Sequence, residues 1–155
     1  MPQLLVGDAL LSRAEAALAV ALPDALGVEF VDPADPLCGV AFTVGGLAVT
    51  PAATLHGAAL AAALELAGYL AVLPTLTVAE HAVTHHIATQ YLRPAGTGQR
   101  VTVVGELTRR TRSMAFLTVT ARRDDGTTHA VQDPRLGDDR QVIAQSQITK
   151  SVVAS

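Results

Sequence analysis

Hydrophobic residues follow two different patterns along the chain, and each predicts a different kind of element. Between residues 56 and 73 nearly every position is apolar, with Glu65 as the one charged residue. The run ends at Pro74, and proline stops a helix because it lacks a backbone donor and clashes with the preceding turn. A helix without a polar face cannot lie on a surface. The pattern therefore predicts a central helix that the rest of the chain surrounds.

Most other segments alternate apolar and polar residues, or form short apolar runs between turn residues, which is typical of strands. The expected strands are 28–31, 39–44, 83–92, 100–107, 113–122 and 141–152. Long strands joined by short turns predict an antiparallel sheet. We therefore expect an α+β fold in which this sheet wraps around the apolar helix, with an unpaired edge or face that favours dimerisation.

Two other parts of the chain do not follow these patterns of central helix and strands. Residues 8–22 predict an extra N-terminal amphipathic helix, with Asp8 as its N-cap. Asp124–Gly126 predicts a hairpin turn, and the polar segment 133–140 predicts a loop that is either a lid or an insertion. No linker or repeat interrupts the chain. We expect one domain over residues 1–155, with its core at about 26–152.

Composition narrows the function. Aromatic residues make up 3% of the 155 residues and the net charge is −3, which disfavours a nucleic-acid partner because such proteins usually show a basic surface. The single cysteine, Cys38, allows no intrachain disulfide and favours a reducing compartment, so we expect a cytoplasmic protein. We do not expect a membrane protein, because the apolar run is shorter than a typical span and carries Glu65 at its middle.

The start of the central helix carries the most informative chemistry. Free N–H groups in the first turn of a helix can polarise a carbonyl group and hold an oxyanion. Gly57 lets a substrate approach that backbone because it has no side chain. Glu65 is costly in an apolar helix unless it has a task or a partner. Gly57 is therefore a candidate carbonyl-binding residue, and Glu65 is a candidate general base or nucleophile, unless it is a structural carboxylate.

The spacing of these two residues adds a constraint. Eight residues of helix separate Gly57 from Glu65 by about 12 Å along the axis. One reacting carbon cannot touch both within a single chain. Two such helices running antiparallel across a twofold axis would bring Gly57 of one chain opposite Glu65 of the other. The spacing therefore predicts a site shared between two subunits.

The same segment resembles a known family. His56-Gly57-Ala58 followed by Glu65, then Tyr91-Leu-Arg-Pro-Ala95 and Gly98, is similar to the hotdog-fold thioesterases of the phenylacetate-degradation (PaaI-like) type. In that family a His-Gly-Gly motif opens the central helix, and an Asp or Glu follows nine positions after the His. The resemblance covers roughly residues 26 to 150.

The resemblance implies an acyl-CoA or acyl-carrier-protein thioesterase that assembles as a homodimer or a dimer of dimers. Gly57 would polarise the thioester carbonyl and Glu65 would act as base or nucleophile, with His56 and Thr50 beside them. Thr50 stands about where many members carry Asn or Gln. Val83 offers no hydroxyl where some members have Ser, although Thr84 does. No cofactor is implied apart from the coenzyme A of the substrate.

The arginines and histidines suggest two further kinds of site, of which the first stays open and the second is not expected. Arg109, Arg110 and Arg112 form a basic turn that either is solvated or holds the phosphates of coenzyme A, since guanidinium groups bind phosphate well. The histidines at 81, 85 and 86 do not predict a metal site, because adjacent residues of a strand point to opposite faces and no further ligand completes a set.

Two other functions remain compatible with these residues. One is a non-catalytic hotdog protein that binds acyl thioesters, which the departures at residues 50 and 83 favour. The other is a hotdog hydratase or dehydratase, which needs an Asp and a His placed together over the substrate. No such pair stands out on the central helix.

Overall fold

The computed structural model describes residues 1–124 and 141–155. Most of the expected hairpin turn and all of the loop 133–140 therefore lie outside the described residues. The strands are β1 (Glu29–Phe30), β2 (Val40–Thr43), β3 (Glu80–Tyr91), β4 (Arg100–Arg110), β5 (Met114–Asp124) and β6 (Val142–Ala154). The helices are α1 (Gly7–Leu18), α2 (Ala21–Ala25) and α3 (Gly57–Val72), with short 3₁₀ turns at Pro36–Cys38, Gly46–Ala48 and Leu73–Thr75.

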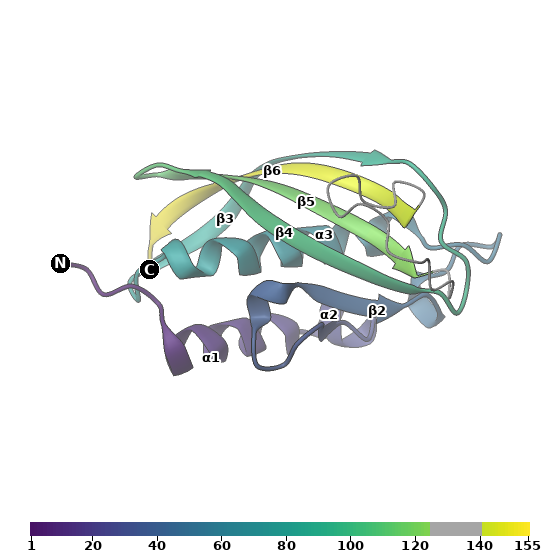
Figure 1. Cartoon of the computed structure of the whole chain (residues 1–155), viewed down its shortest axis with the longest axis horizontal. Coiled ribbons are helices and arrows are strands. Elements are labelled where there is room, and N and C mark those ends of the chain that lie inside the picture. Colours follow the sequence, from purple (N-terminus) through teal and green to yellow (C-terminus); the bar gives the residue numbers. More distant parts are fainter. Residues whose placement is uncertain (125–140) are drawn as a thin grey trace, which may run out of the picture.

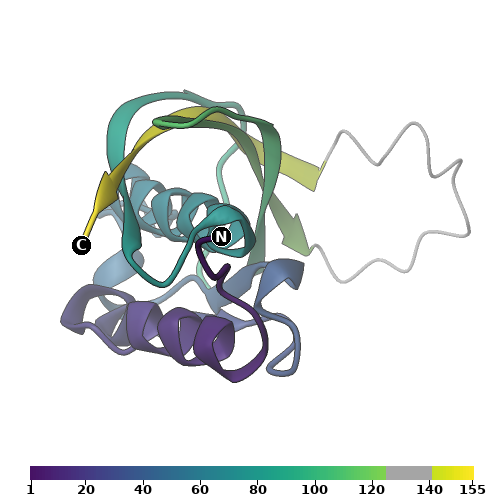
Figure 2. The ribbon, with the colours of Figure 1, turned by 90° about the vertical axis from the view of Figure 1, so that its left-hand side faces the viewer.

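The strands form one antiparallel sheet in the order β1-β2-β4-β5-β6-β3. Figure 1 shows the long strands curving over one side of α3, and Figure 2 shows the same sheet end-on, curled around the helix. The expected architecture, a long antiparallel sheet wrapped around one hydrophobic helix, is confirmed.

The core forms where the inner face of the sheet meets α3. Alternate residues of β5 face the helix and are buried, because side chains on a strand point alternately to its two faces. They are Ala115, Leu117, Val119 and Ala121. From the helix, Leu60, Leu64 and Leu70 are at most 3% exposed. Small side chains on both surfaces let the helix and the sheet pack closely.

The N-terminal segment covers the other side of α3 (Figure 2). The expected helix over 8–22 is two helices, since α1 ends at Leu18 and α2 begins at Ala21. Pro23 lies inside α2, in its first turn, where a missing backbone donor is tolerated. The N-cap of α1 is Val6, so Asp8 lies in the first turn and does not cap the helix.

One stripe of α3 remains half-exposed in the single chain. It includes Gly57, Ala61, Glu65 and Tyr69, which follow one another at intervals of four and therefore form a continuous row along the helix surface. The expectation that the rest of the chain surrounds the helix is thus correct for most, but not all, of the helix surface. Among the described residues, Gly57–Thr75 is the helical stretch long and apolar enough to cross a membrane, but 56% of that stretch is buried inside the domain.

Helix and sheet approach each other closely at Gly105 of β4. A Cβ atom built there would stand 2.5 Å from the carbonyl oxygen of Ala67 and 3.0 Å from the Cβ of Ala71. The nearest atom is a backbone oxygen of α3, which cannot turn away as the end of a flexible side chain could. Glycine is therefore required at this position by the packing distance.

We expect Gly105→Ala to lower the free energy of unfolding by about 1–3 kcal/mol, the usual cost of overpacking a core. Urea denaturation of the purified variant measures it. Gly45→Ala is the matched control, because Gly45 has an extended backbone (φ 176°) and no atom within 4 Å of its added methyl group. A Gly105→Ala protein as stable as the control would contradict the close approach.

Candidate active site

A network of backbone hydrogen bonds holds the segment that leads into α3. The Leu55 N–H donates to the Ala95 carbonyl and the His56 N–H to the Ala48 carbonyl, each at 2.7 Å. His56 is the N-cap of α3, and its Nδ1 accepts a hydrogen bond from the Ala58 N–H at 3.1 Å. His56 therefore fixes the start of the helix and satisfies one of its first-turn donors.

Gly57 is the first residue of the helix, so its N–H has no partner within the helix. The ring of Tyr91 lies over it, since a methyl group added to Gly57 would stand 3.7 Å from Tyr91 Cε1. The Tyr91 hydroxyl donates to the Gly57 carbonyl oxygen at 3.2 Å. A groove of about 340 Å³ opens here, lined by Leu55, Gly57, Leu60 and Tyr91–Ala95.

Thr50 lies in the turn before this segment. Its hydroxyl is 2.9 Å from the Thr54 hydroxyl, and its carbonyl accepts a hydrogen bond from the Ala53 N–H at 2.9 Å. Ala53 has a left-handed backbone conformation (φ 58°), which costs energy for a residue other than glycine. The hydrogen bonds of Thr50 therefore stabilise a strained turn that immediately precedes the approach to α3.

Glu65 lies in the middle of α3 and is paired with a lysine that the sequence analysis did not identify. The Lys150 Nζ of β6 donates to Glu65 Oε2 at 2.9 Å, and the Thr84 hydroxyl of β3 donates to the same oxygen at 2.7 Å. Lys150 also donates to the Thr84 oxygen at 2.9 Å. Lys150 is buried, whereas the Glu65 side chain is 34% exposed.

The structure does not bring Gly57 and Glu65 of one chain together. Two helical turns separate them, and the residues that line the groove at Gly57 do not include Glu65 within the described part of the chain. They do share the half-exposed stripe of α3. The two candidate residues therefore face the same side of the molecule at different positions along it.

The three arginines of the expected phosphate site do not all lie on one face of the sheet. Arg109 pairs with Phe116 across β4 and β5, and Arg110 with Ala115, so the two arginines point to opposite faces of the sheet. Arg110 forms an ion pair with Glu80 at 3.7 Å. The backbone N–H of Thr77 also bonds to Glu80 and, with Arg110, holds the pKa of that carboxyl below its usual range. Arg109 and Arg112 are exposed.

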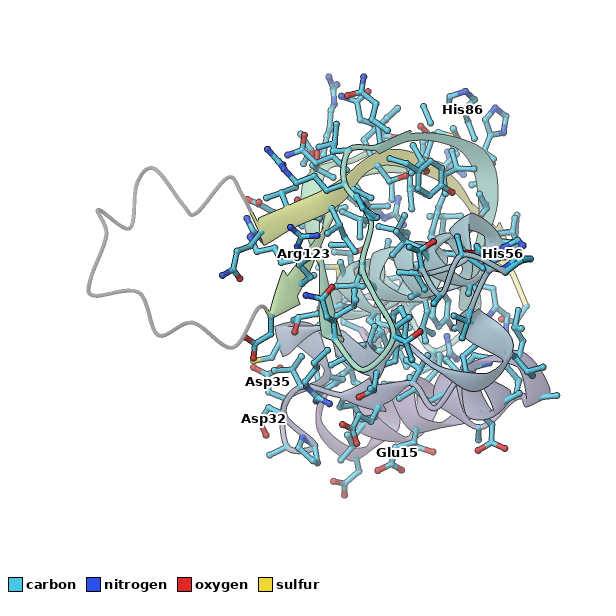
Figure 3. All side chains as sticks on the ribbon, turned by 90° about the vertical axis from the view of Figure 1, so that its right-hand side faces the viewer. Glu15, Asp32, Asp35, His56, His86 and Arg123 are labelled. Atoms are coloured by element: carbon cyan, nitrogen blue, oxygen red, sulfur yellow. The ribbon has the colours of Figure 1, made fainter. Side chains whose placement is uncertain are left out.

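His86 and Cys38 lie apart from this site. In Figure 3 His86 stands on the outer side of the sheet, away from His56 at the helix start. No group of three His, Cys, Asp or Glu residues that could hold a metal occurs in residues 1–124 and 141–155. The Cys38 thiol donates to Asp35 at 3.4 Å, and this hydrogen bond raises its pKa, which disfavours the nucleophilic thiolate.

Lys150 was missed because it lies in the last strand, far along the chain from Glu65. A signal was present, since Ala144, Ser146, Ile148, Lys150 and Val152 alternate with the outward-facing residues of this strand. A lysine at an inward position of a buried strand needs an acidic partner. Glu65 is the one charged residue of the apolar helix that this strand covers, so the pair could have been proposed.

Comparison with known proteins assigns the family. The family model of the thioesterase superfamily matches residues 52–130, which include Gly57, Glu65 and β3 to β5. The chain belongs to the thioesterase superfamily. This membership supports thioester hydrolysis as the general class of reaction. No curated protein sequence matches the chain.

Solved structures show the same hotdog fold. A thioesterase from Haemophilus influenzae is 20% identical, with 93% of this chain and 90% of that chain covered and a TM-score of 0.72. A Bacillus halodurans protein solved with CoA is 21% identical, with 93% and 83% covered and a TM-score of 0.70. A mutant of the phenylacetic acid degradation protein PaaI from Thermus thermophilus is 22% identical, with 83% and 95% covered and a TM-score of 0.63.

Proposed function

We propose that the protein hydrolyses an acyl-CoA or acyl-carrier-protein thioester at a site shared between two subunits. The Gly57 N–H of one subunit polarises the thioester carbonyl, and Glu65 of the other subunit acts on the same carbon. The observation that carries this proposal is the position of Gly57 and Glu65 on one half-exposed stripe of α3, two turns apart. That stripe is what a second copy would cover.

The edge of the sheet supports a homodimer. β3 is the outermost strand, it spans Glu80–Tyr91, and most of its side chains are exposed. A long edge strand presents unpaired backbone donors and acceptors that a second strand can use. An antiparallel pairing of two β3 strands about a twofold axis midway between Thr84 and Tyr91 would set Thr84, which bonds to Glu65, opposite Tyr91 of the partner subunit, which covers Gly57 there. Such dimers can pair again into a tetramer.

Two chemical routes fit this arrangement. In one, Glu65 takes a proton from water, the water oxygen bonds to the carbonyl carbon, and the carbon–sulfur bond breaks to release a thiol and an acid. In the other, Glu65 attacks the carbon directly, the carbon–sulfur bond breaks to release the thiol, and water then cleaves the resulting anhydride to give the acid and restore Glu65. The Gly57 N–H stabilises the negative charge on the carbonyl oxygen in both. Incorporation of solvent ¹⁸O into Glu65 during turnover distinguishes the second route.

Coenzyme A is the carrier that the comparisons favour, because a structural neighbour with the same fold was solved with CoA. The groove at Gly57 has room for a thioester arm, since ligand pockets begin at about 300 Å³. His56 and Thr50 act by positioning the helix start. Arg109 and Arg112 are exposed and available for the CoA phosphates, whereas Arg110 is engaged by Glu80.

A second function, non-catalytic binding of acyl thioesters, is favoured by two observations. Glu65 Oε2 already accepts hydrogen bonds from Lys150 and Thr84, as a structural carboxylate would. Thr50, which stands where many members of the family carry an amide, uses its hydroxyl within its own turn. A binding protein with these features would hold acyl-CoA without releasing thiol. The first experiment therefore measures both hydrolysis and binding.

The purified protein and Glu65→Gln are assayed against short-, medium-, long-chain and aryl acyl-CoA thioesters, with free thiol read by a chromogenic disulfide. We expect the wild type to release thiol from at least one thioester and Glu65→Gln to lose roughly 100-fold or more in kcat, because the carboxylate activates or attacks. Circular dichroism and acyl-CoA binding confirm that the variant is folded and occupied.

Absence of thiol release by the wild type, with acyl-CoA still bound, would contradict hydrolysis and favour the binding function. Hydration of an enoyl-CoA with the thioester bond intact would instead show a hydratase. Equal kcat values for the wild type and Glu65→Gln would show that Glu65 takes no part in the reaction.

The Gly57 N–H can be deleted without breaking the helix. Proline is tolerated at the first helical position, and His56 has the extended conformation (φ −70°, ψ 130°) that a residue before proline prefers. We expect Gly57→Pro to lower kcat by roughly 100- to 1,000-fold, the usual effect of removing an oxyanion donor. Gly57→Ala is the control, because it keeps the N–H and its methyl group fits beside Tyr91. Equal loss in both variants would mean that crowding, not the missing donor, is responsible.

The proposed contact between the arginines and the CoA phosphates is tested by measuring the KM for acyl-CoA. We expect the double change of Arg109 and Arg112 to Ala to raise the KM for acyl-CoA several-fold with little change in kcat, since the arginines would bind parts of the substrate remote from the reacting carbon. An acyl-pantetheine thioester, which lacks the nucleotide phosphates, should keep its KM. An unchanged KM for acyl-CoA would exclude these arginines.

A further inference from the structure

Lys150 is a charged residue buried beneath the central helix. It is 3% exposed and lies on β6, paired on one side with Thr84 of β3 and on the other with Ala115 of β5. Its aliphatic part passes under α3, since a methyl group added to Gly68 would stand 3.8 Å from Lys150 Cε. The lysine stem thus lies against the helix at Gly68, about one turn from Glu65.

The contacts of Lys150 form a closed triangle with fixed donor directions. Lys150 Nζ donates to Glu65 Oε2 and to the Thr84 oxygen, and the Thr84 hydroxyl donates to Glu65 Oε2. The ammonium group has no lone pair, so Thr84 must accept from Lys150 and use its one proton for Glu65. Both donors therefore converge on Oε2, and Oε1 has no hydrogen-bond partner among the described residues.

A β-bulge in β3 makes this triangle possible. The register shifts between Thr84 and His86, so Thr84 faces Lys150 while Ile87 faces Ile148, both on the inner side of the sheet. In a regular strand residues 84 and 87 would point to opposite faces. The bulge thus turns the Thr84 hydroxyl toward Glu65 without exposing the apolar residues that follow, which is a common use of bulges near active sites.

We propose that Lys150 is a positioning residue for Glu65. Together with Thr84 it holds the carboxylate by Oε2, so that Oε1 alone is presented at the half-exposed stripe to act on water or on the thioester. The buried ammonium also balances the charge of a carboxylate on an otherwise apolar helix. This inference rests on the proposed function, because it assigns Lys150 a role through the residue that we propose performs the reaction.

Four proteins test the role of Lys150: the wild type, Glu65→Gln, Lys150→Met and the double variant. Methionine fills the space of the lysine stem without its charge. We expect Lys150→Met to lower kcat by roughly 10- to 100-fold, as misplacement of a reacting group does, with KM nearly unchanged. In the Glu65→Gln background the same change should have almost no further effect, because Lys150 acts through Glu65. A kcat unchanged by Lys150→Met, or an equal loss in both backgrounds, would overturn the proposal.

Thr84→Val tests the same network with the buried charge left in place, so it serves even where Lys150→Met folds poorly. Its matched control is Thr89→Val, on the same strand and the same face, whose hydroxyl lies 2.9 Å from the Ser146 hydroxyl and does not bond to Glu65. We expect a lower kcat for Thr84→Val and a wild-type kcat for Thr89→Val. Equal kcat values for the two variants would contradict a specific effect on Glu65.

The outcomes separate this inference from the proposed function. If Glu65→Gln is inactive while Lys150→Met and Thr84→Val turn over like the wild type, hydrolysis through Glu65 stands and the positioning role is overturned. If the wild type releases no thiol, or Glu65→Gln is as fast as the wild type, the proposed function fails and the role of Lys150 fails with it.

Discussion

The burial of an almost entirely apolar helix is the constraint on which the rest of the structure depends. α3 has a large hydrophobic surface that only a surrounding sheet can remove from water. The sheet meets it so closely that Gly105 has no room for a Cβ atom. This packing fixes the position of α3, and with it Gly57 at one end and Glu65 in the middle. The chemistry is thus placed on a rigid element, while the loops around it supply the groove.

The same constraint explains the charges in the interior. A carboxylate on a helix of this kind is tolerated where it has partners, and Lys150 and Thr84 supply them from two neighbouring strands. The stripe that contains Glu65 is the part of α3 that the sheet leaves half-exposed. Beside it runs β3, an edge strand whose inward-facing Ile87 and Tyr91 are 37% and 54% exposed. One face of the protein therefore combines unpaired backbone, exposed apolar side chains and the proposed catalytic carboxylate.

The sequence alone predicted the features that depend on local pattern. The central helix, its start at His56–Gly57 and the succession of strands along the chain follow from apolar periodicity, glycine and proline, and the structure confirms them. Features that depend on contacts between distant segments were not predicted. Lys150 lies 85 positions from Glu65. The bulge that turns Thr84 inward changes the strand alternation by one residue, which a period-two pattern does not reveal. Arg109 and Arg110 form one basic cluster in the sequence, but β4 places their side chains on opposite faces of the sheet.

The central claim is that one active site uses Gly57 of one subunit and Glu65 of the other. It is tested most directly with heterodimers, isolated by two different affinity tags, that pair a Glu65→Gln chain with a Gly57→Pro chain. If the site is shared, one of the two sites in each heterodimer combines the intact Glu65 with the intact Gly57. The heterodimer should then recover roughly half of the wild-type kcat per dimer, although both parent homodimers are nearly inactive. Heterodimers as inactive as their parents would contradict the account, because both residues would then act within a single chain.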